Sequence, residues 1–230
     1  MKLCKSAKVE PLTLSEEDLA LINAHTLREL SADDVFVFKI LMCDNEVDRD
    51  IERFSVDALQ GFAKLFLGKT MIQDHFASAS NQTARIFDTE VVQDPERKTS
   101  FGEPYTALMA KVYMARTESK ADLIREIEAG IKKEVSVSCR VGRLSCSICG
   151  NETGRCKHIP GKMYDGVYCH TLLNDAKDAY EVSFVAVPAQ KNAGTTKTHE
   201  DDETEKKAAE AVEADLEMLK AFIFCENEKG

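Results

Sequence analysis

The sequence has no apolar run near the roughly 18 to 20 residues that a membrane-spanning helix needs. Its first residues, Met1 to Lys5, also lack the apolar stretch and small-residue cleavage site of a signal peptide. We therefore expect neither a membrane span nor secretion, and we expect no disulfides. No internal repeat is present, and 230 residues would be cramped for a two-domain enzyme.

Basic side chains are outnumbered, with 30 Lys and Arg against 40 Asp and Glu, so the formal charge is -10. The imbalance is concentrated at residues 198–230, which contain 11 acidic and 4 basic side chains. An acidic protein has no electrostatic reason to prefer nucleic acid or an anionic membrane surface. The remaining residues are nearly neutral and suffice for one compact domain with a buried core.

The apolar patterns predict an α+β fold. Three helices are expected: one capped by Ser15, one capped by Ser55 and stopped by Gly68, and one over residues 120–129 after Ser119. Short β-branched and aromatic runs predict strands at 34–43, 70–73, 83–92, 106–115, 133–141 and 179–187. We expect these strands to form a small, closed or nearly closed, mostly antiparallel β-barrel flanked by the helices.

The strand expected at residues 133–141 alternates strictly between apolar and polar positions. Alternate residues of a strand point to opposite faces of its sheet. One face should therefore carry Val135, Val137, Cys139 and Val141, and the other Ser136, Ser138 and Arg140.

Glu181 interrupts the otherwise apolar strand at residues 179–187, which should end before Pro188. A buried carboxylate is costly unless it has a partner, and histidine is a good candidate. His75 follows the strand at residues 70–73, where a general base can project from a strand end. Each residue alone has an ordinary structural explanation. Together with Ser136, His75 and Glu181 would supply the nucleophile, the base and the orienting carboxylate of serine acyl transfer.

Three of the eight cysteines lie within a short stretch that also contains a histidine. A CxxC turn followed by a Cys-x-His pair offers the four ligands of a closed tetrahedral zinc site. With four protein ligands no position is open to a substrate, so this zinc would be structural. Either Cys169 or His170 could replace the histidine of the set. The expected ligands are Cys146, Cys149, Cys156 and His158.

This cysteine-rich stretch allows three alternatives to a purely structural zinc site. It could be a loop that is merely rich in cysteine, or a redox CxxC, although the βαβ setting of thioredoxin is missing. A nucleic-acid-binding zinc finger is the third possibility, because residues 140–162 carry five basic side chains and one acidic side chain. A solvated turn explains these charges equally well, and the acidic balance of the chain disfavours nucleic acid.

Four stretches resemble one protein family: Asn45–Phe54, Asp74–His75, Lys133–Cys139 and Ala179–Ala189. The sequence looks like the prohead (capsid maturation) proteases of tailed bacteriophages, which share their fold with the herpesvirus assemblins. The similarity runs over residues 35–197, in the family's order of His, Ser and carboxylate. The last stretch resembles the family's strand of Glu-Val-Ser, hydrophobic residues and Pro-Ala. Some phage relatives also carry a Cys-rich insertion between the serine and glutamate strands.

The resemblance implies a serine endopeptidase with Ser136 as nucleophile, His75 as general base and Glu181 as the residue that orients His75. Its substrates would be the major capsid protein and the scaffold, inside the immature procapsid in the cytoplasm of the bacterial host. The resemblance also suggests a dimer. The alternative is a catalytically inactive capsid assembly or scaffold protein with the same fold.

One departure from the family bears on activity. Family members usually have Ser-x-Gly at the nucleophile, but Ser138 stands in place of the glycine. Its side chain could crowd the substrate, and Ser138 is a rival nucleophile because it shares a face with Ser136. Cys139, on the opposite face, is a poor rival. Asp74 is a rival to Glu181 as the residue that orients histidine.

The sequence divides into four parts. We expect a helical lead-in at 1–34, a prohead-protease-like domain at 35–192 with the zinc-loop insertion at 142–172, an acidic linker at 193–205 and an amphipathic helix at 206–224. A single helix of this length is marginal alone, so it should pack on the domain, self-associate or bind a scaffold or capsid protein. In the family such C-terminal segments are often removed by self-cleavage.

Overall fold

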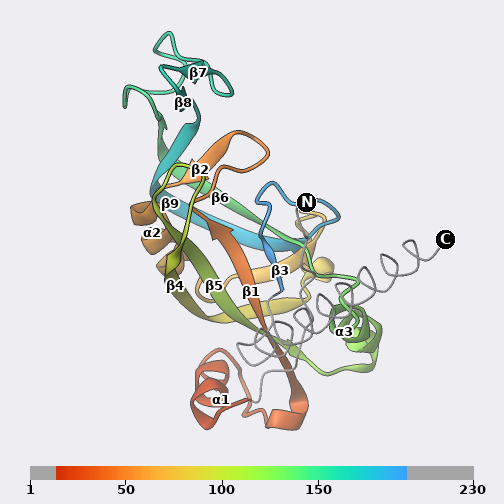
Figure 1. Ribbon diagram of the computed structural model, residues 1–230. Helices are drawn as coiled ribbons and strands as arrows, with labels where there is room; N and C mark the ends of the chain where they lie inside the picture. Colours follow the sequence, from red (N-terminus) through yellow and green to blue (C-terminus); the bar gives the residue numbers. More distant parts are fainter. Residues whose placement is uncertain (1–13, 196–230) are drawn as a thin grey trace, which may run out of the picture. The chain divides into compact units, whose positions relative to one another are not determined.

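The computed structural model describes residues 14–195 (Figure 1). Its helices are α1 (Glu16–Asn23), α2 (Val56–Phe66) and α3 (Ala121–Glu128). The strands of the main sheet are β1 (Val35–Asp44), β2 (Glu52–Phe54), β3 (Thr70–Gln73), β4 (Ala84–Lys98), β5 (Pro104–Ala115), β6 (Val135–Cys146), β9 (Thr171–Phe184) and β10 (Gly194–Thr195). A separate small hairpin consists of β7 (Met163–Tyr164) and β8 (Val167–Tyr168).

The main sheet is mostly antiparallel. Its strand order is β10-β1-β5-β4-β3-β9-β2, and β6 also pairs with β9. The parallel pairings are those of β9 with β2 and with β3. An α+β fold with a mostly antiparallel sheet and three α-helices in residues 14–195 agrees with the prediction from the sequence.

Of the two forms that the sequence allowed, the closed barrel is wrong, because the strands of residues 14–195 do not close into one. An isolated bridge between Glu134 and Gly194 links the start of β6 to β10. Since β10 has only two residues, this contact remains an isolated bridge and not a continuous strand pairing. The ends of the sheet therefore meet at a single point.

Two of the three predicted helix caps are confirmed. The hydroxyl of Ser15 accepts a hydrogen bond from the Asp18 N–H at 3.0 Å, and that of Ser55 accepts one from the Ala58 N–H at 3.2 Å. Ser119 instead lies in a 3-10 turn, Glu118–Lys120, and α3 has no side-chain cap. None of the helices described for residues 14–195 is long and apolar enough to cross a membrane.

Helix α2 packs closely against β9, β4 and β5. Phe62 and Phe66 are fully buried on its inner face, and burying a phenylalanine stabilises the fold by about 1.5–3 kcal/mol. Gly61 allows the close approach to β9, because a Cβ there would lie 2.8 Å from the Cβ of Ala176. Gly68 then turns the chain toward β3 with φ +78, a conformation that favours glycine.

The β6–β9 hairpin is longer than the sequence predicted. The strands expected at 133–141 and 179–187 extend to Cys146 and back to Thr171, which pair with each other. Residues at both ends of the expected insertion at 142–172 therefore belong to the sheet. Strand β9 ends at Phe184 and not at residue 187. The hairpin projects from the sheet and carries β7 and β8 at its tip (Figure 1).

Some predictions fall outside the described residues. These are the first 13 residues of the lead-in, the linker from residue 196 onward and the helix at 206–224.

Candidate active site and metal site

His75 lies just beyond the end of β3, next to β9. The parallel pairing of these strands places Gln73 opposite Phe184, and His75 turns back toward Glu181. Its Nδ1 lies 2.6 Å from Oε1 of Glu181. The His75 side chain is 41% exposed, whereas that of Glu181 is only 10% exposed. The imidazole therefore has a buried carboxylate on its Nδ1 side, the arrangement found in Ser-His-carboxylate triads.

Ser183 connects both members of this pair. Its hydroxyl donates to Oε2 of Glu181 at 2.8 Å and accepts from the His75 backbone N–H at 2.9 Å. Asp74 and His75 both have left-handed backbones, with φ of +55 and +52. Such conformations cost non-glycine residues about 1–3 kcal/mol each and persist only when their surroundings fix them. The buried Ser183 hydroxyl is one group that does so.

Ser136 and Ser138 share the sheet face of Glu181 and Ser183. In the antiparallel ladder, Ser136 pairs with Ser183 and Ser138 pairs with Glu181. Directly paired residues project on the same side, with Cβ atoms about 4.5–5.5 Å apart. Val137, between the two serines, packs on the core, as the alternation predicted.

Within residues 14–195, no hydrogen bond joins His75 to Ser136 or Ser138. Such bonds are often formed only when substrate is bound, so both serines remain candidates on geometric grounds.

Cys139 and Asp74 do not take the roles of nucleophile and orienting residue. Burial raises the pKa of the Cys139 thiol to about 12, so the reactive thiolate is scarce at neutral pH. Glu181, and not Asp74, lies at Nδ1 of His75.

On the hypothesis that His75 is a general base, replacing Ser183 with alanine should lower kcat by about 10- to 100-fold while KM changes little, because His75 and Glu181 lose their shared hydrogen-bond partner. Kinetics should be normalised by active-site titration, since a merely structural effect would reduce the active fraction and not the turnover of each active site. Ser145→Ala, at a buried serine of the neighbouring strand β6, is the control and should keep its kcat. Equal kcat values for the two variants would contradict a positioning role.

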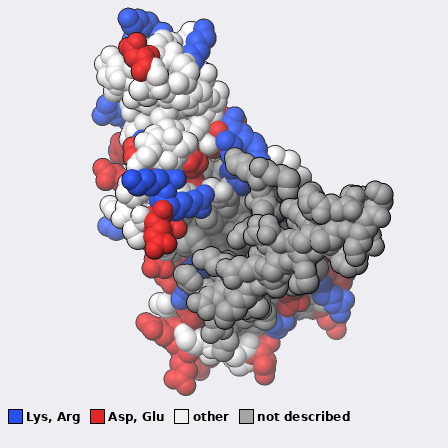
Figure 2. Space-filling view, in the orientation of Figure 1, with Lys and Arg blue, Asp and Glu red and all other residues white. Residues whose placement is uncertain are grey.

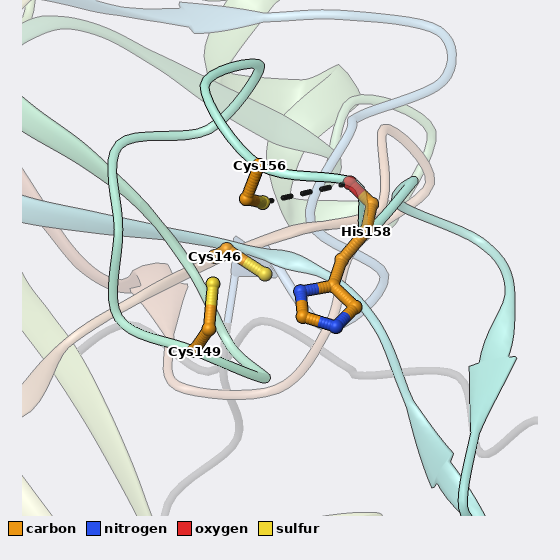
Figure 3. A group of neighbouring side chains, drawn as sticks. All are labelled: Cys146, Cys149, Cys156 and His158. Carbon is orange, nitrogen blue, oxygen red and sulfur yellow. Dashed lines mark hydrogen bonds between the residues drawn. The ribbon is translucent and has the colours of Figure 1, made fainter.

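The four predicted metal ligands come together at the tip of the β6–β9 hairpin (Figure 3). Their ligand atoms all lie within 4.8 Å of one another. Zinc–sulfur bonds of about 2.3 Å would place tetrahedral sulfur ligands roughly 3.8 Å apart, so a small contraction would complete the geometry. Nδ1 of His158 is buried without a hydrogen-bond partner. Cys146, Cys149, Cys156 and His158 could therefore hold a metal ion such as zinc.

The turn around Cys146 also favours the thiolate form that binds metal. Burial opposes ionisation, but the backbone N–H groups of Cys149 and Ile148, together with the thiols of Cys156 and Cys149, outweigh it. The pKa of Cys146 is thereby lowered to about 6. Gly150 closes the turn with φ +72, and its N–H donates to the Cys146 carbonyl at 2.9 Å.

Cys169 and His170, the alternative ligands, lie beside the cluster. Sγ of Cys169 is 3.9 Å from Sγ of Cys146 but is not one of the four grouped ligand atoms. Nε2 of His170 accepts a hydrogen bond from Arg53 at 2.9 Å, and its Nδ1 lies 3.1 Å from the Tyr168 carbonyl. Burial lowers the pKa of His170, in keeping with a neutral ring. His170 thus links the tip to the sheet.

Arg53 anchors this link and was not singled out from the sequence. Its side chain is 9% exposed and forms two hydrogen bonds with the Glu103 carboxylate, at 2.6 and 2.8 Å. Its partners are 50 and 117 residues away in the chain, so no local signal indicates the contact. Ser183 could have been found, because it lies two residues from Glu181 and therefore on the same strand face.

Residues 45–54 pack against the chain that follows β9. The Arg49 side chain donates to the Pro188 carbonyl, and its backbone N–H donates to the Ala189 carbonyl at 3.1 Å. Gln190 donates to the Asp48 carboxylate at 3.3 Å. The stretch at 45–54 therefore holds the chain that follows β9.

Comparisons with protein-family models, curated proteins and solved structures found no match for this chain.

Proposed function

We propose that this protein is a serine endopeptidase with Ser136 as nucleophile, His75 as general base and Glu181 as the orienting carboxylate. The observation that carries the proposal is the 2.6 Å contact between His75 Nδ1 and Glu181 Oε1, on the sheet face that also bears Ser136. A carboxylate at Nδ1 leaves Nε2 to exchange protons with substrate groups.

In this mechanism the Ser136 hydroxyl oxygen attacks the carbonyl carbon of the scissile peptide bond while Nε2 of His75 takes its proton. The tetrahedral intermediate collapses when the imidazolium gives that proton to the leaving amine. An acyl-enzyme remains, and His75 then activates a water molecule that releases the acid and restores the serine. Glu181 keeps the imidazole in the correct tautomer and stabilises its positive charge.

The substrates we propose are the capsid and scaffold proteins of an immature phage shell, processed inside the procapsid within the host cytoplasm. The four stretches that resemble prohead proteases support this assignment. Ser138, where the family has glycine, favours the second candidate, an inactive assembly protein with the same fold.

We further propose that the metal bound by the four-ligand cluster is zinc and that its role is structural. Three thiols and one imidazole suit zinc, and such a ligand set leaves no site for a substrate. Lys and Arg side chains near the tip appear as separate groups in Figure 2. On this face they form no continuous basic patch, so the view does not favour a nucleic-acid-binding finger.

A fluorophosphonate probe tests the peptidase proposal without knowledge of the substrate. The wild-type protein should gain one phosphonyl group on the tryptic peptide that contains Ser136. His75→Gln should react at least about 100-fold more slowly, because general-base catalysis contributes roughly 10²–10⁴-fold. The measurement is intact-mass spectrometry over time, followed by peptide mapping. A wild-type protein that reacts no faster than His75→Gln would favour the inactive assembly protein.

A further inference from the structure

A pocket of about 420 Å³ adjoins the candidate catalytic residues. Asp74 precedes His75, Phe184 follows Ser183, and Glu134 lies two residues before Ser136. All three line this pocket, together with Gln73, Ile131, Lys132, Val185 and Ala186. A polypeptide with its scissile bond at Ser136 could place a neighbouring side chain here.

Part of the pocket wall is apolar. Phe184 is buried, and its ring packs beside that of Phe38 with centroids 6.2 Å apart, so this part of the wall is fixed by the core. Ile131, in contrast, is 70% exposed. An aliphatic chain in the pocket would cover this exposed surface, and the removal of apolar area from water would favour its binding.

Within the described part of the chain, some charged side chains of the pocket have ion-pair partners and one does not. Nζ of Lys132 lies 3.2 Å from the Glu126 carboxylate and also donates to Gln73 at 3.1 Å. Glu134 has Lys133 at 3.8 Å. The carboxylate of Asp74 takes part in no ion pair or side-chain hydrogen bond within residues 14–195.

The backbone conformation of Asp74 is a second reason to assign a function to its carboxylate. Asp74 and His75 are consecutive residues in the left-handed region, where strain is commonly associated with function. His75 uses the turn to reach Glu181, and the same turn places Asp74 on the pocket wall.

We propose that this pocket binds the substrate side chain next to the scissile bond and that Asp74 selects a lysine or arginine there. The aliphatic stem would lie along Ile131 and Phe184, and the positive end group would pair with the Asp74 carboxylate. This inference rests on the proposed peptidase function, for which it names the substrate class.

Cleavage of a proteome-derived peptide mixture, read by mass spectrometry, tests the selectivity. The wild type should prefer Lys or Arg over norleucine-sized apolar residues at one position beside the cleaved bond by about tenfold, and Asp74→Asn should lose this preference. Asp165→Asn is the matched control, because Asp165 is also an exposed aspartate with a left-handed backbone, at φ +49 on the β7–β8 turn. A wild-type preference for apolar or acidic residues, or one unchanged in Asp74→Asn, would overturn the proposal.

A binding measurement separates failure of the pocket from failure of the peptidase. In ¹H–¹⁵N NMR of the Ser136→Ala protein, Nα-acetyl-lysine methylamide should shift the amides of Asp74, Lys132 and Phe184, and the norleucine analogue should do so several-fold more weakly. The Asp74→Asn change should remove the difference. Equal binding of the two compounds, or no binding, would overturn the pocket assignment even if the fluorophosphonate labels the wild type. Lysine-selective binding without fluorophosphonate labelling would instead support the pocket assignment and contradict the peptidase function.

Discussion

Ser136→Ala should lower kcat/KM by roughly 10⁴- to 10⁶-fold, the loss expected when the nucleophile of a serine peptidase is removed. The hydroxyl oxygen forms the covalent bond to the substrate, so His75 and Glu181 alone have nothing to activate for acyl transfer. The measurement is cleavage of a co-expressed candidate capsid protein or of a peptide identified from the mixture, followed by mass spectrometry.

Ser138→Ala is the matched control for this loss. Both serines lie on one sheet face and are partly exposed, so the two substitutions remove the same atom from neighbouring sites. We expect Ser138→Ala to keep activity within about tenfold of wild type, since a residue that does not react contributes only packing and polarity. Loss of activity in Ser138→Ala with retention in Ser136→Ala would move the nucleophile to Ser138. Activity retained in both single variants would mean that neither serine alone is the required nucleophile.

Much of the secondary structure could be predicted because its causes are local. Ser15 and Ser55 cap helices with their own side chains, and Val135 and Val137 face the core by simple alternation. The lengths of β6 and β9 could not be predicted in this way. Near the hairpin tip one strand pairs Arg143 with Asn174 of the other, so polar residues continue a ladder that apolar periodicity cannot reveal.

Closure of the sheet depends on contacts between distant residues. Whether a barrel forms is decided where Glu134 meets Gly194, about 60 positions away in the chain, and no periodicity in either segment specifies how many residues pair there. The contact of Arg53 with His170 could not be predicted from the sequence either, because these residues are also far apart in the chain.

The two candidate sites were predictable to different degrees. The residues of the candidate metal site lie within one short stretch, so their spacing predicted the three cysteines, and His158 with Cys169 and His170 as alternatives. The partnership of His75 with Glu181 could be inferred only from the cost of burying a lone carboxylate, and the structure places the two in contact. The left-handed turn at Asp74, which makes this contact possible, has no signal in an Asp-His dipeptide.

Cys149→Ser should reduce the bound zinc from about one equivalent per chain to nearly none, and residues 147–170 should lose their order. Structural zinc contributes about 10–16 kcal/mol of apparent binding energy in zinc-finger peptides, far more than the two-residue strands β7 and β8 could supply. Metal analysis of the purified protein measures the first effect, and hydrogen exchange of this segment measures the second. Cys169→Ser is the control and should keep its zinc, because Cys169 lies beside the cluster and is not a member. Zinc retained in Cys149→Ser but lost in Cys169→Ser would instead make Cys169 the ligand.

The same zinc-free protein should still react with fluorophosphonate. Cys146 lies ten positions beyond Ser136 on β6, which at about 3.3 Å per residue separates the tip from the candidate nucleophile by roughly 33 Å. Ser136 pairs with Ser183 at the opposite end of the hairpin, next to the core that α2 and the central strands bury. Loss of zinc should therefore change the labelling rate less than about twofold, since distant and independent sites usually contribute additively. A large loss of labelling together with the metal would mean that the tip supports the active site, and the zinc would then have a role beyond local stability.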